Sequence, residues 1–109
     1  ARAHLLECIR LVEQVGVARE GIFALEATVE LLVTLGRHAE GARLDGAARA
    51  ARQTFGTPCM RYEEREAASL FVRLAERLGE ANAERLRAAG AELTLTLAIS
   101  EAGQMLAGT

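Results

Sequence analysis

The segment from residue 21 to residue 56 constrains the fold most, because its hydrophobic side chains follow the period of two helices joined by a very short link. The spacing predicts helices over residues 21–35 and 38–55. Their apolar faces consist of Ile22, Leu25, Val29 and Leu32 in the first helix, and of Leu44, Ala48, Ala51 and Phe55 in the second. The link Gly36-Arg37 forces an antiparallel return, since glycine tolerates the left-handed backbone that ends helices. The sequence therefore predicts an α-helical hairpin.

Helical patterns flank this hairpin on both sides. Residues 3–15 have helical spacing, and we expect Gly16 to end that helix and residues 17–20 to link it to the hairpin. After the hairpin, Gly56 is placed to end the second helix. Thr57 and Pro58 then suit the N-cap and the first position of a fourth helix, which we expect to run to about residue 78.

The last third of the chain predicts two further helices. Gly79 separates the fourth helix from a short one over residues 81–89, which we expect Gly90 to close. The alternation over residues 93–97 is also typical of a strand, but a single strand has no pairing partner in a helical chain. We therefore expect Thr94 to cap a sixth helix that ends near residue 106.

Packing contacts can also be predicted for these helices. The expected buried face of the fourth helix is Ala67, Phe71, Leu74 and Leu78, with Ala68, Leu70 and Ala75 at its flanks. The fifth helix offers only Ala83 and Leu86 to a core. Three glycines without a preceding strand indicate close approach of helices and not a nucleotide-binding loop: Gly21, Gly41 and Gly46.

These patterns predict an all-α fold of antiparallel hairpins, a tetratricopeptide-like α-solenoid fragment of five to six helices. At 109 residues the chain has the length of one domain, with repeat-like helices over residues 1–56 and capping helices over residues 57–109. No helix precedes the one over residues 3–15, so we expect its antiparallel mate to have been lost and the chain to be a piece of a larger protein.

Composition argues against several classes of function. The 13 basic residues, all arginine, face 15 acidic ones, and a net charge of −2 provides no field to hold a nucleic acid. The sequence predicts no membrane span, metal site, cofactor site or catalytic centre. We interpret His4 and His38 as surface or helix-end residues, because neither has a Cys, His or Asp at ligand spacing. Two cysteines, Cys8 and Cys59, are too few for a disulfide framework, so we expect a reducing cytoplasm. We interpret both as small buried hydrophobic residues, and the alternative is that they form a redox pair.

One row of charges is a candidate docking surface. The hairpin's second helix and the turn before it carry arginines that we expect to face outward, namely Arg37, Arg43, Arg49 and Arg52. Such a row can dock an acidic partner, such as an ATPase domain or a second copy of the chain, or can simply face solvent.

A family resemblance runs through nearly the whole chain. It is carried by Glu20-Gly21-Ile22, Ala24-Leu25-Glu26, Leu35-Gly36-Arg37-His38, Ala42-Arg43-Leu44, Gly46-Ala47-Ala48, Arg52, Phe55-Gly56, Pro58, Leu78-Gly79-Glu80, Gly90, Leu93-Thr94-Leu95 and Ala98. In order and spacing these residues resemble the C-terminal tetratricopeptide-like region of bacterial ATPase regulators. That family includes LuxR-type and antibiotic-regulatory transcription factors and cyclase-linked signalling ATPases. Asp45 stands where the family usually has Leu, and Ala83 and Arg87 stand where it tends to carry aromatics.

The resemblance implies a helical scaffold that follows a nucleotide-binding domain and serves protein contacts, inducer sensing or self-association. Combined with the absence of catalytic motifs, it predicts a non-catalytic protein-interaction and regulatory module of a transcriptional regulator or signalling ATPase. The alternative is a sensor for a small apolar ligand (an inducer), held in the groove between the hairpin and the fourth helix.

Overall fold

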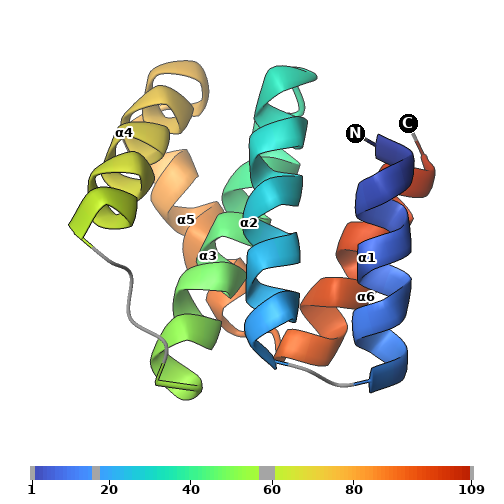
Figure 1. Ribbon diagram of the computed structural model, residues 1–109. Coiled ribbons are helices and arrows are strands. Elements are labelled where there is room, and N and C mark those ends of the chain that lie inside the picture. The colour runs from blue at the N-terminus through green and yellow to red at the C-terminus, as the bar shows by residue number, and fades with distance from the viewer. Residues whose placement is uncertain (1, 16–17, 57–60, 109) are drawn as a thin grey trace.

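The computed structural model describes residues 2–15, 18–56 and 61–108, with the backbone alone over residues 11–15 and 61–63. Within these ranges the chain forms six α-helices and no strand (Figure 1). The helices are α1 Arg2–Val15, α2 Ala18–Thr34, α3 His38–Thr54, α4 Arg61–Leu78, α5 Glu80–Ala91 and α6 Leu95–Ala107. The all-α class predicted from periodicity is confirmed.

The α2–α3 hairpin forms as predicted. Gly36 adopts a positive φ of 81°. This conformation lets the Arg37 N–H donate to the Leu32 carbonyl at 2.8 Å, which satisfies one of the last carbonyls of α2. The start of α2 was predicted too late, because residues 18–20, expected as part of a link, are already helical. The predicted cap at Thr57-Pro58 lies outside the described residues.

The hairpin interior is built from the predicted stripes. On α2, all four predicted side chains are buried: Ile22, Leu25, Val29 and Leu32. On α3, Leu44, Ala48 and Ala51 are buried, but Phe55 is 49% exposed because α3 ends one residue before it. Alanines fill much of the α3 face, so the neighbouring helices approach its backbone closely.

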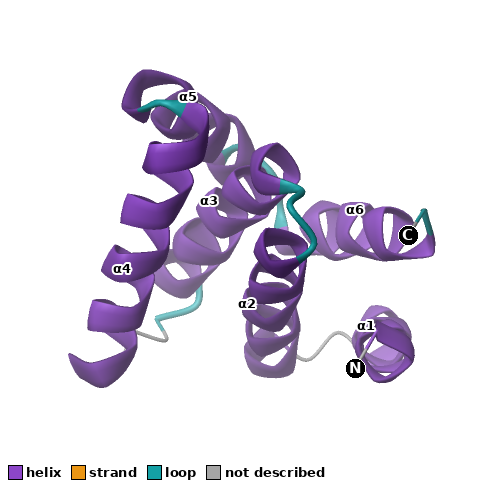
Figure 2. Ribbon diagram, turned by 90° about the horizontal axis from the view of Figure 1, so that it is seen from above, coloured by secondary structure: helices purple, strands orange, loops and turns teal. Residues whose placement is uncertain are grey.

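The closest approach joins α3 to α5, which lie side by side in Figures 1 and 2. A Cβ atom on Gly46 would overlap the backbone carbonyl of Arg87, and a Cβ on Gly90 would overlap that of Arg43. Each glycine therefore faces the other helix's backbone with no room for a side chain. The prediction for Gly46 is confirmed, whereas Gly90 does not close α5: it lies inside the helix as a packing point.

Helix α1 has a partner that the sequence pattern did not indicate. It packs against α6 as well as α2, and the start of α1 lies beside the end of α6 (Figure 1). The Arg2 Nε donates to the Leu106 carbonyl oxygen at 2.8 Å, and Ile9 is buried against the core. Helix α6 therefore covers part of α1, and the loss of an antiparallel mate that preceded α1 stays a prediction. Thr94 caps α6 as predicted, its side chain accepting from the Leu97 N–H at 3.2 Å.

The buried face of α4 is rotated from the predicted one. Leu70 and Leu74 are its most buried side chains, while Phe71 and Ala67 are half-buried. The Phe71 ring instead lies 4.4 Å from the Arg87 guanidinium on α5, a cation–π contact that suits a half-exposed aromatic.

Candidate functional site

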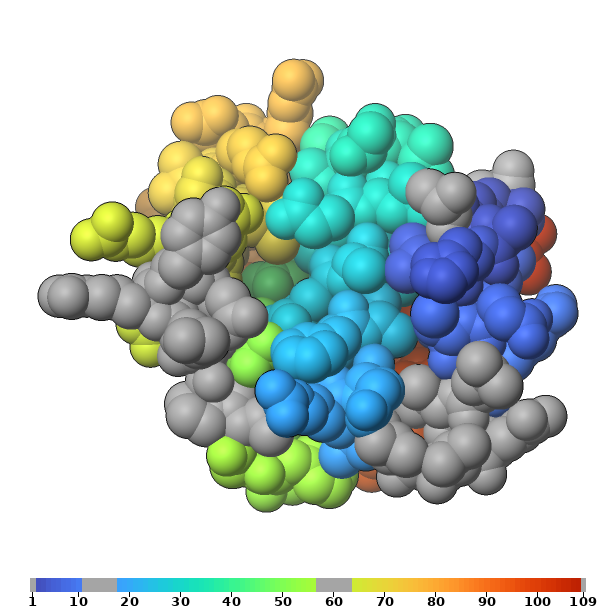
Figure 3. Space-filling model, in the orientation of Figure 1, coloured from blue at the N-terminus to red at the C-terminus, as the bar shows by residue number. Residues whose placement is uncertain are grey.

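A pocket of about 340 Å³ opens between α2, α3 and α4. In Figure 3 this face is hollowed between α2 and α4, with α3 visible at the bottom of the hollow. Helix α2 contributes Glu26, Ala27, Val29 and Glu30, α3 contributes Asp45 and Arg49, and α4 contributes Glu66, Ala67 and Leu70. The pocket lies in the groove between the hairpin and the fourth helix, where the sequence analysis expected a small apolar ligand. Five of its lining side chains are charged, so the groove is more polar than that expectation required.

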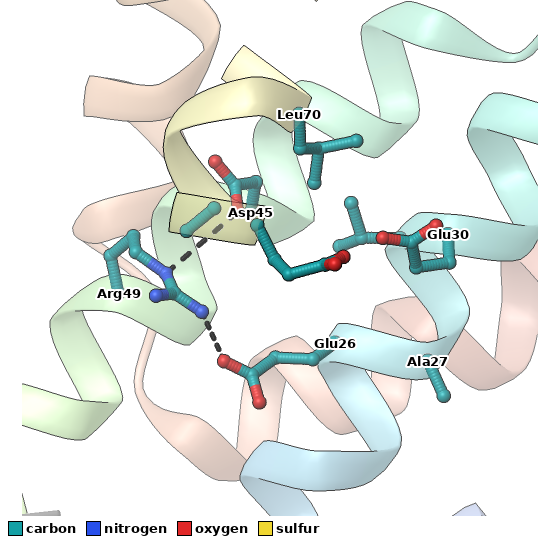
Figure 4. Close-up of a pocket in the computed structure, with 9 residues that line it drawn as sticks. Glu26, Ala27, Glu30, Asp45, Arg49 and Leu70 are labelled. Atoms are coloured by element: carbon teal, nitrogen blue, oxygen red, sulfur yellow. Dashed lines mark hydrogen bonds and ion pairs between the residues drawn. The ribbon is translucent and has the colours of Figure 1, made fainter. Parts of the chain in front are cut away.

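A chain of alternating charges forms one wall of the pocket. Arg52 binds the Glu26 carboxylate through two hydrogen bonds of 2.7 Å, and Arg49 pairs with the same carboxylate. Arg49 also lies 3.8 Å from Asp45, which forms an ion pair of 3.0 Å with Arg87. Figure 4 shows Arg49 between Glu26 and Asp45. The network therefore connects α2, α3 and α5 through five side chains.

Asp45 is the most buried member of this network, with 3% of its side chain exposed. Burial raises the pKa of Asp45 above its ordinary value, although the guanidinium groups of Arg87 and Arg49 act in the opposite direction. The nearby Glu26 carboxylate adds to the increase. The ion pairs of Asp45 therefore do not fully offset the free-energy cost of removing its carboxylate from water.

The four candidate docking arginines do not form one surface. Arg49 and Arg52 converge on Glu26 of α2, whereas Arg37 and Arg43 point to α6. Arg37, the residue before α3, donates to the Met105 carbonyl oxygen at 2.7 Å and pairs with Glu40 in the first turn of α3. Arg52 is only 7% exposed, so the expectation that it faces outward is wrong. Each guanidinium is held within the molecule, and docking by this row stays a prediction.

Arg43 and Glu101 form a second pair, which fixes α6 on α3. Two hydrogen bonds of 2.8 and 3.1 Å join them. These bonds favour the charged forms of both groups, so the pKa of Arg43 is raised and that of Glu101 is lowered. A shallower hollow of about 420 Å³ adjoins this pair, lined by Arg37, Glu40, Glu101, Gln104 and Met105.

Two residues noted as departures from the family pattern, Asp45 and Arg87, meet across the α3–α5 contact. Sequence reasoning treated them separately because they are 42 positions apart in the chain, with one whole helix between them. An acidic residue between Leu44 and Gly46, on a helix face made of small residues, was the available signal that a buried charge needs a partner. Glu26, Glu30 and Glu66 carried no such signal.

Other chemistry is sparse in the described part of the chain. The Cys8 Sγ lies 3.7 Å from the His4 Nε2, so the expectation that His4 has no cysteine at a helical spacing is wrong. Cys8 is half-buried, and Cys59 lies outside the described residues. Over residues 2–15, 18–56 and 61–108, no three His, Cys, Asp or Glu side chains gather as a metal site would require. None of the helices described there has the length and apolarity needed to cross a membrane.

The fold and pocket define an all-helical protein with a polar pocket between a hairpin and its neighbouring helix. No protein-family model, curated protein or solved structure matches the chain.

Proposed function

We propose that this chain is a non-catalytic interaction and regulatory module of a bacterial transcriptional regulator or signalling ATPase, working in the cytoplasm. In this proposal the α2–α3 and α4–α5 hairpins are tetratricopeptide-like units stacked through the α3–α5 contact. The mutual fit of Gly46 and Gly90 supports stacking of this kind, because it needs backbone-to-backbone approach between successive hairpins. The proposed partner is a protein, either a second copy or another domain of the parent chain.

The observation that carries the proposal is an exposed aromatic pair at one end of the hairpin. Phe23, near the start of α2, is 44% exposed, and Phe55, just after α3, is 49% exposed. Because the helices are antiparallel, both residues lie at the same end. Arg19 and Arg52 lie 5.6 and 5.8 Å from the Phe23 ring centre. Aromatic and arginine side chains are the residue types enriched in protein-interface hot spots.

Light scattering across a wide concentration range tests this proposal. Phe23→Ser combined with Phe55→Ser is expected to reduce any self-association, because it removes the aromatic anchors from the surface. Val72→Ser is the matched control, since Val72 is an equally exposed apolar residue on α4. A protein that stays strictly monomeric at every concentration would contradict self-association. The remaining partner would then be another domain of the parent chain, and co-purification with that chain would test it.

The pocket between α2, α3 and α4 favours a second candidate function, the sensing of a small ligand. Its volume of about 340 Å³ falls in the range of small-molecule sites, and its lining mixes apolar and charged side chains. Thermal unfolding in the presence of a panel of small effectors tests this candidate. Stabilisation that is lost when Ala67 is replaced by Trp, a substitution that fills the pocket, is the expected result.

A further inference from the structure

Helix α1 brings a histidine and a cysteine together on its surface. His4 and Cys8 are four positions apart in the helix, so they lie one turn apart on the same face. The Cys8 Sγ lies 3.7 Å from the His4 Nε2. His4 is exposed and Cys8 is half-buried, so the pair is accessible from outside the protein. An imidazole nitrogen and a cysteine sulfur are the two commonest ligands of zinc in proteins.

The distance between the two donor atoms matches a zinc site. Zinc binds a thiolate sulfur at about 2.3 Å and an imidazole nitrogen at about 2.0–2.1 Å, with tetrahedral angles. Two such ligands on one tetrahedral ion are therefore about 3.5–3.6 Å apart. The observed separation of 3.7 Å between the Cys8 Sγ and the His4 Nε2 is close to this value. Both atoms can therefore bind one ion without a change of backbone.

The backbone on both sides of the pair is held in place. Two residues before His4, the Arg2 Nε donates to the Leu106 carbonyl oxygen at 2.8 Å and ties the first turn of α1 to α6. Directly after Cys8, Ile9 is 2% exposed and packs in the core. A metal ion that bound here would therefore not have to order this turn of the helix, and the ligand pair is preorganised.

One chain supplies only half of a closed zinc site. A structural zinc ion has four protein ligands. Within the described part of the chain, no third His, Cys, Asp or Glu joins His4 and Cys8. A second copy related by a two-fold axis presents the same pair from its own α1, because such an interface places the same surface of both copies face to face. Two copies together provide two cysteines and two histidines.

We propose that His4 and Cys8 bind a zinc ion that is shared with the same two residues of a second copy. Each Cys8 thiol loses its proton when its sulfur binds, so one zinc ion releases two protons. The two thiolates balance the charge of Zn²⁺, and each imidazole binds in its neutral form through Nε2. The α1 helices of the two copies then lie against each other at the metal.

This site goes beyond the proposed interaction function and does not depend on it. Helices α1 and α2 run antiparallel in Figure 1, so the start of α1 and the start of α2 lie at opposite ends of the pair. The exposed Phe23 belongs to the start of α2 and His4 to the start of α1. Association through zinc and association through the aromatic pair therefore use different surfaces and can be tested separately.

The test is light scattering of the full chain, kept reduced, with zinc chloride or with a chelator. We expect a dimer in zinc and its dissociation when the chelator removes the metal. Titration calorimetry should give one zinc ion for two chains. Cobalt(II) in place of zinc should produce the absorption band of a thiolate–cobalt bond, which reports a cysteine ligand directly.

Four variants locate the metal. Cys8→Ser and His4→Ala should each weaken zinc binding at least about tenfold and abolish the zinc-dependent dimer, because each removes two of the four ligands. Cys59→Ser and His38→Gln are the matched controls, since they replace the chain's other cysteine and other histidine, and both should keep the zinc response. His4 and Cys8 lie outside the buried core, so their variants should keep the helical circular dichroism of the unsubstituted protein.

Three results would overturn the inference: no zinc-dependent dimer of the unsubstituted protein, a dimer that persists in Cys8→Ser, or one zinc ion bound to each chain without association. The double variant Phe23→Ser and Phe55→Ser should still dimerise in zinc, and loss of that response would also count against a site on α1. If the protein associates in the chelator and only the aromatic double variant prevents it, the proposed interaction function stands and the zinc site fails.

Discussion

Replacing Gly46 with alanine is expected to force α3 and α5 apart. A Cβ at this position would lie 2.6 Å from the carbonyl carbon and 2.7 Å from the Cα of Arg87, with the carbonyl oxygen closer still. Carbon atoms in favourable contact are about 3.5–4.0 Å apart, so the two helices would have to separate by roughly 1 Å. The obstructing atoms belong to the backbone of α5, and no side-chain rotation can relieve the overlap.

The magnitude follows from two opposing terms. Overpacking of a close-packed contact costs about 1–3 kcal/mol or more, and a rigid backbone obstacle places this case at the upper end. Alanine gains about 1 kcal/mol over glycine in a helix interior. The net expectation is a loss of about 2 kcal/mol in the free energy of unfolding. For a domain of this size, that loss corresponds to a melting temperature about 8–16 °C lower.

The assay is urea unfolding followed by circular dichroism, with linear extrapolation to water. Gly103→Ala provides the control, because Gly103 lies inside α6 and its Cβ would meet only the Ile9 side chain at 3.7 Å, an ordinary contact. That variant should gain up to about 1 kcal/mol from helix propensity alone. Equal stability of Gly46→Ala and the parent protein, or equal losses in the two variants, would refute the close-contact reasoning.

Three further outcomes are expected. Leu32→Ala should lower the free energy of unfolding by about 2–5 kcal/mol in urea titrations, because the side chain is fully buried; a loss below about 1 kcal/mol would contradict its place in the core. Glu26→Ala should cost about 3–5 kcal/mol by the same measurement, since it leaves the buried Arg52 guanidinium without its carboxylate, and an unchanged midpoint would show that solvent replaces it. Asp45→Asn tests pH dependence through melting curves between pH 7 and pH 4. The pKa of Asp45 is raised in the folded state, so the folded state takes up its proton at a higher pH than the unfolded state does. The stability that this group contributes therefore rises as pH falls through the raised pKa, and it is complete below the pKa of the unfolded state. Over that pH interval the melting temperature of the parent protein should rise relative to that of the Asn variant. A relative fall would reject the burial argument.

The glycines show where local reasoning is sufficient and where it fails. Gly36, Gly56 and Gly79 adopt positive φ and end helices as predicted, because a helix terminus depends on the conformation of a few consecutive residues. Gly90 looked the same in the sequence but lies within α5 against α3. A glycine that ends a helix and one that admits another helix cannot be told apart until the neighbouring element is placed.

The candidate site was likewise predicted only in part. The groove between the hairpin and α4 was predicted, since an antiparallel hairpin followed by a third helix leaves such a groove. The charge network beside it was not predicted, because Glu26, Asp45 and Arg87 lie on three different helices. Their pairing depends on distances between helices, which periodicity along the chain does not contain.

The sequence by itself determined the helices of the described chain, the hairpin and most of its core, because helical period and glycine breaks act over three or four residues. Only the tertiary structure decided that α6 covers α1, that α5 packs closely on α3 and that buried charges meet beside a pocket. These features follow from which surfaces fill one another's volume and compensate one another's charge. Such complementarity exists only between elements already placed in space.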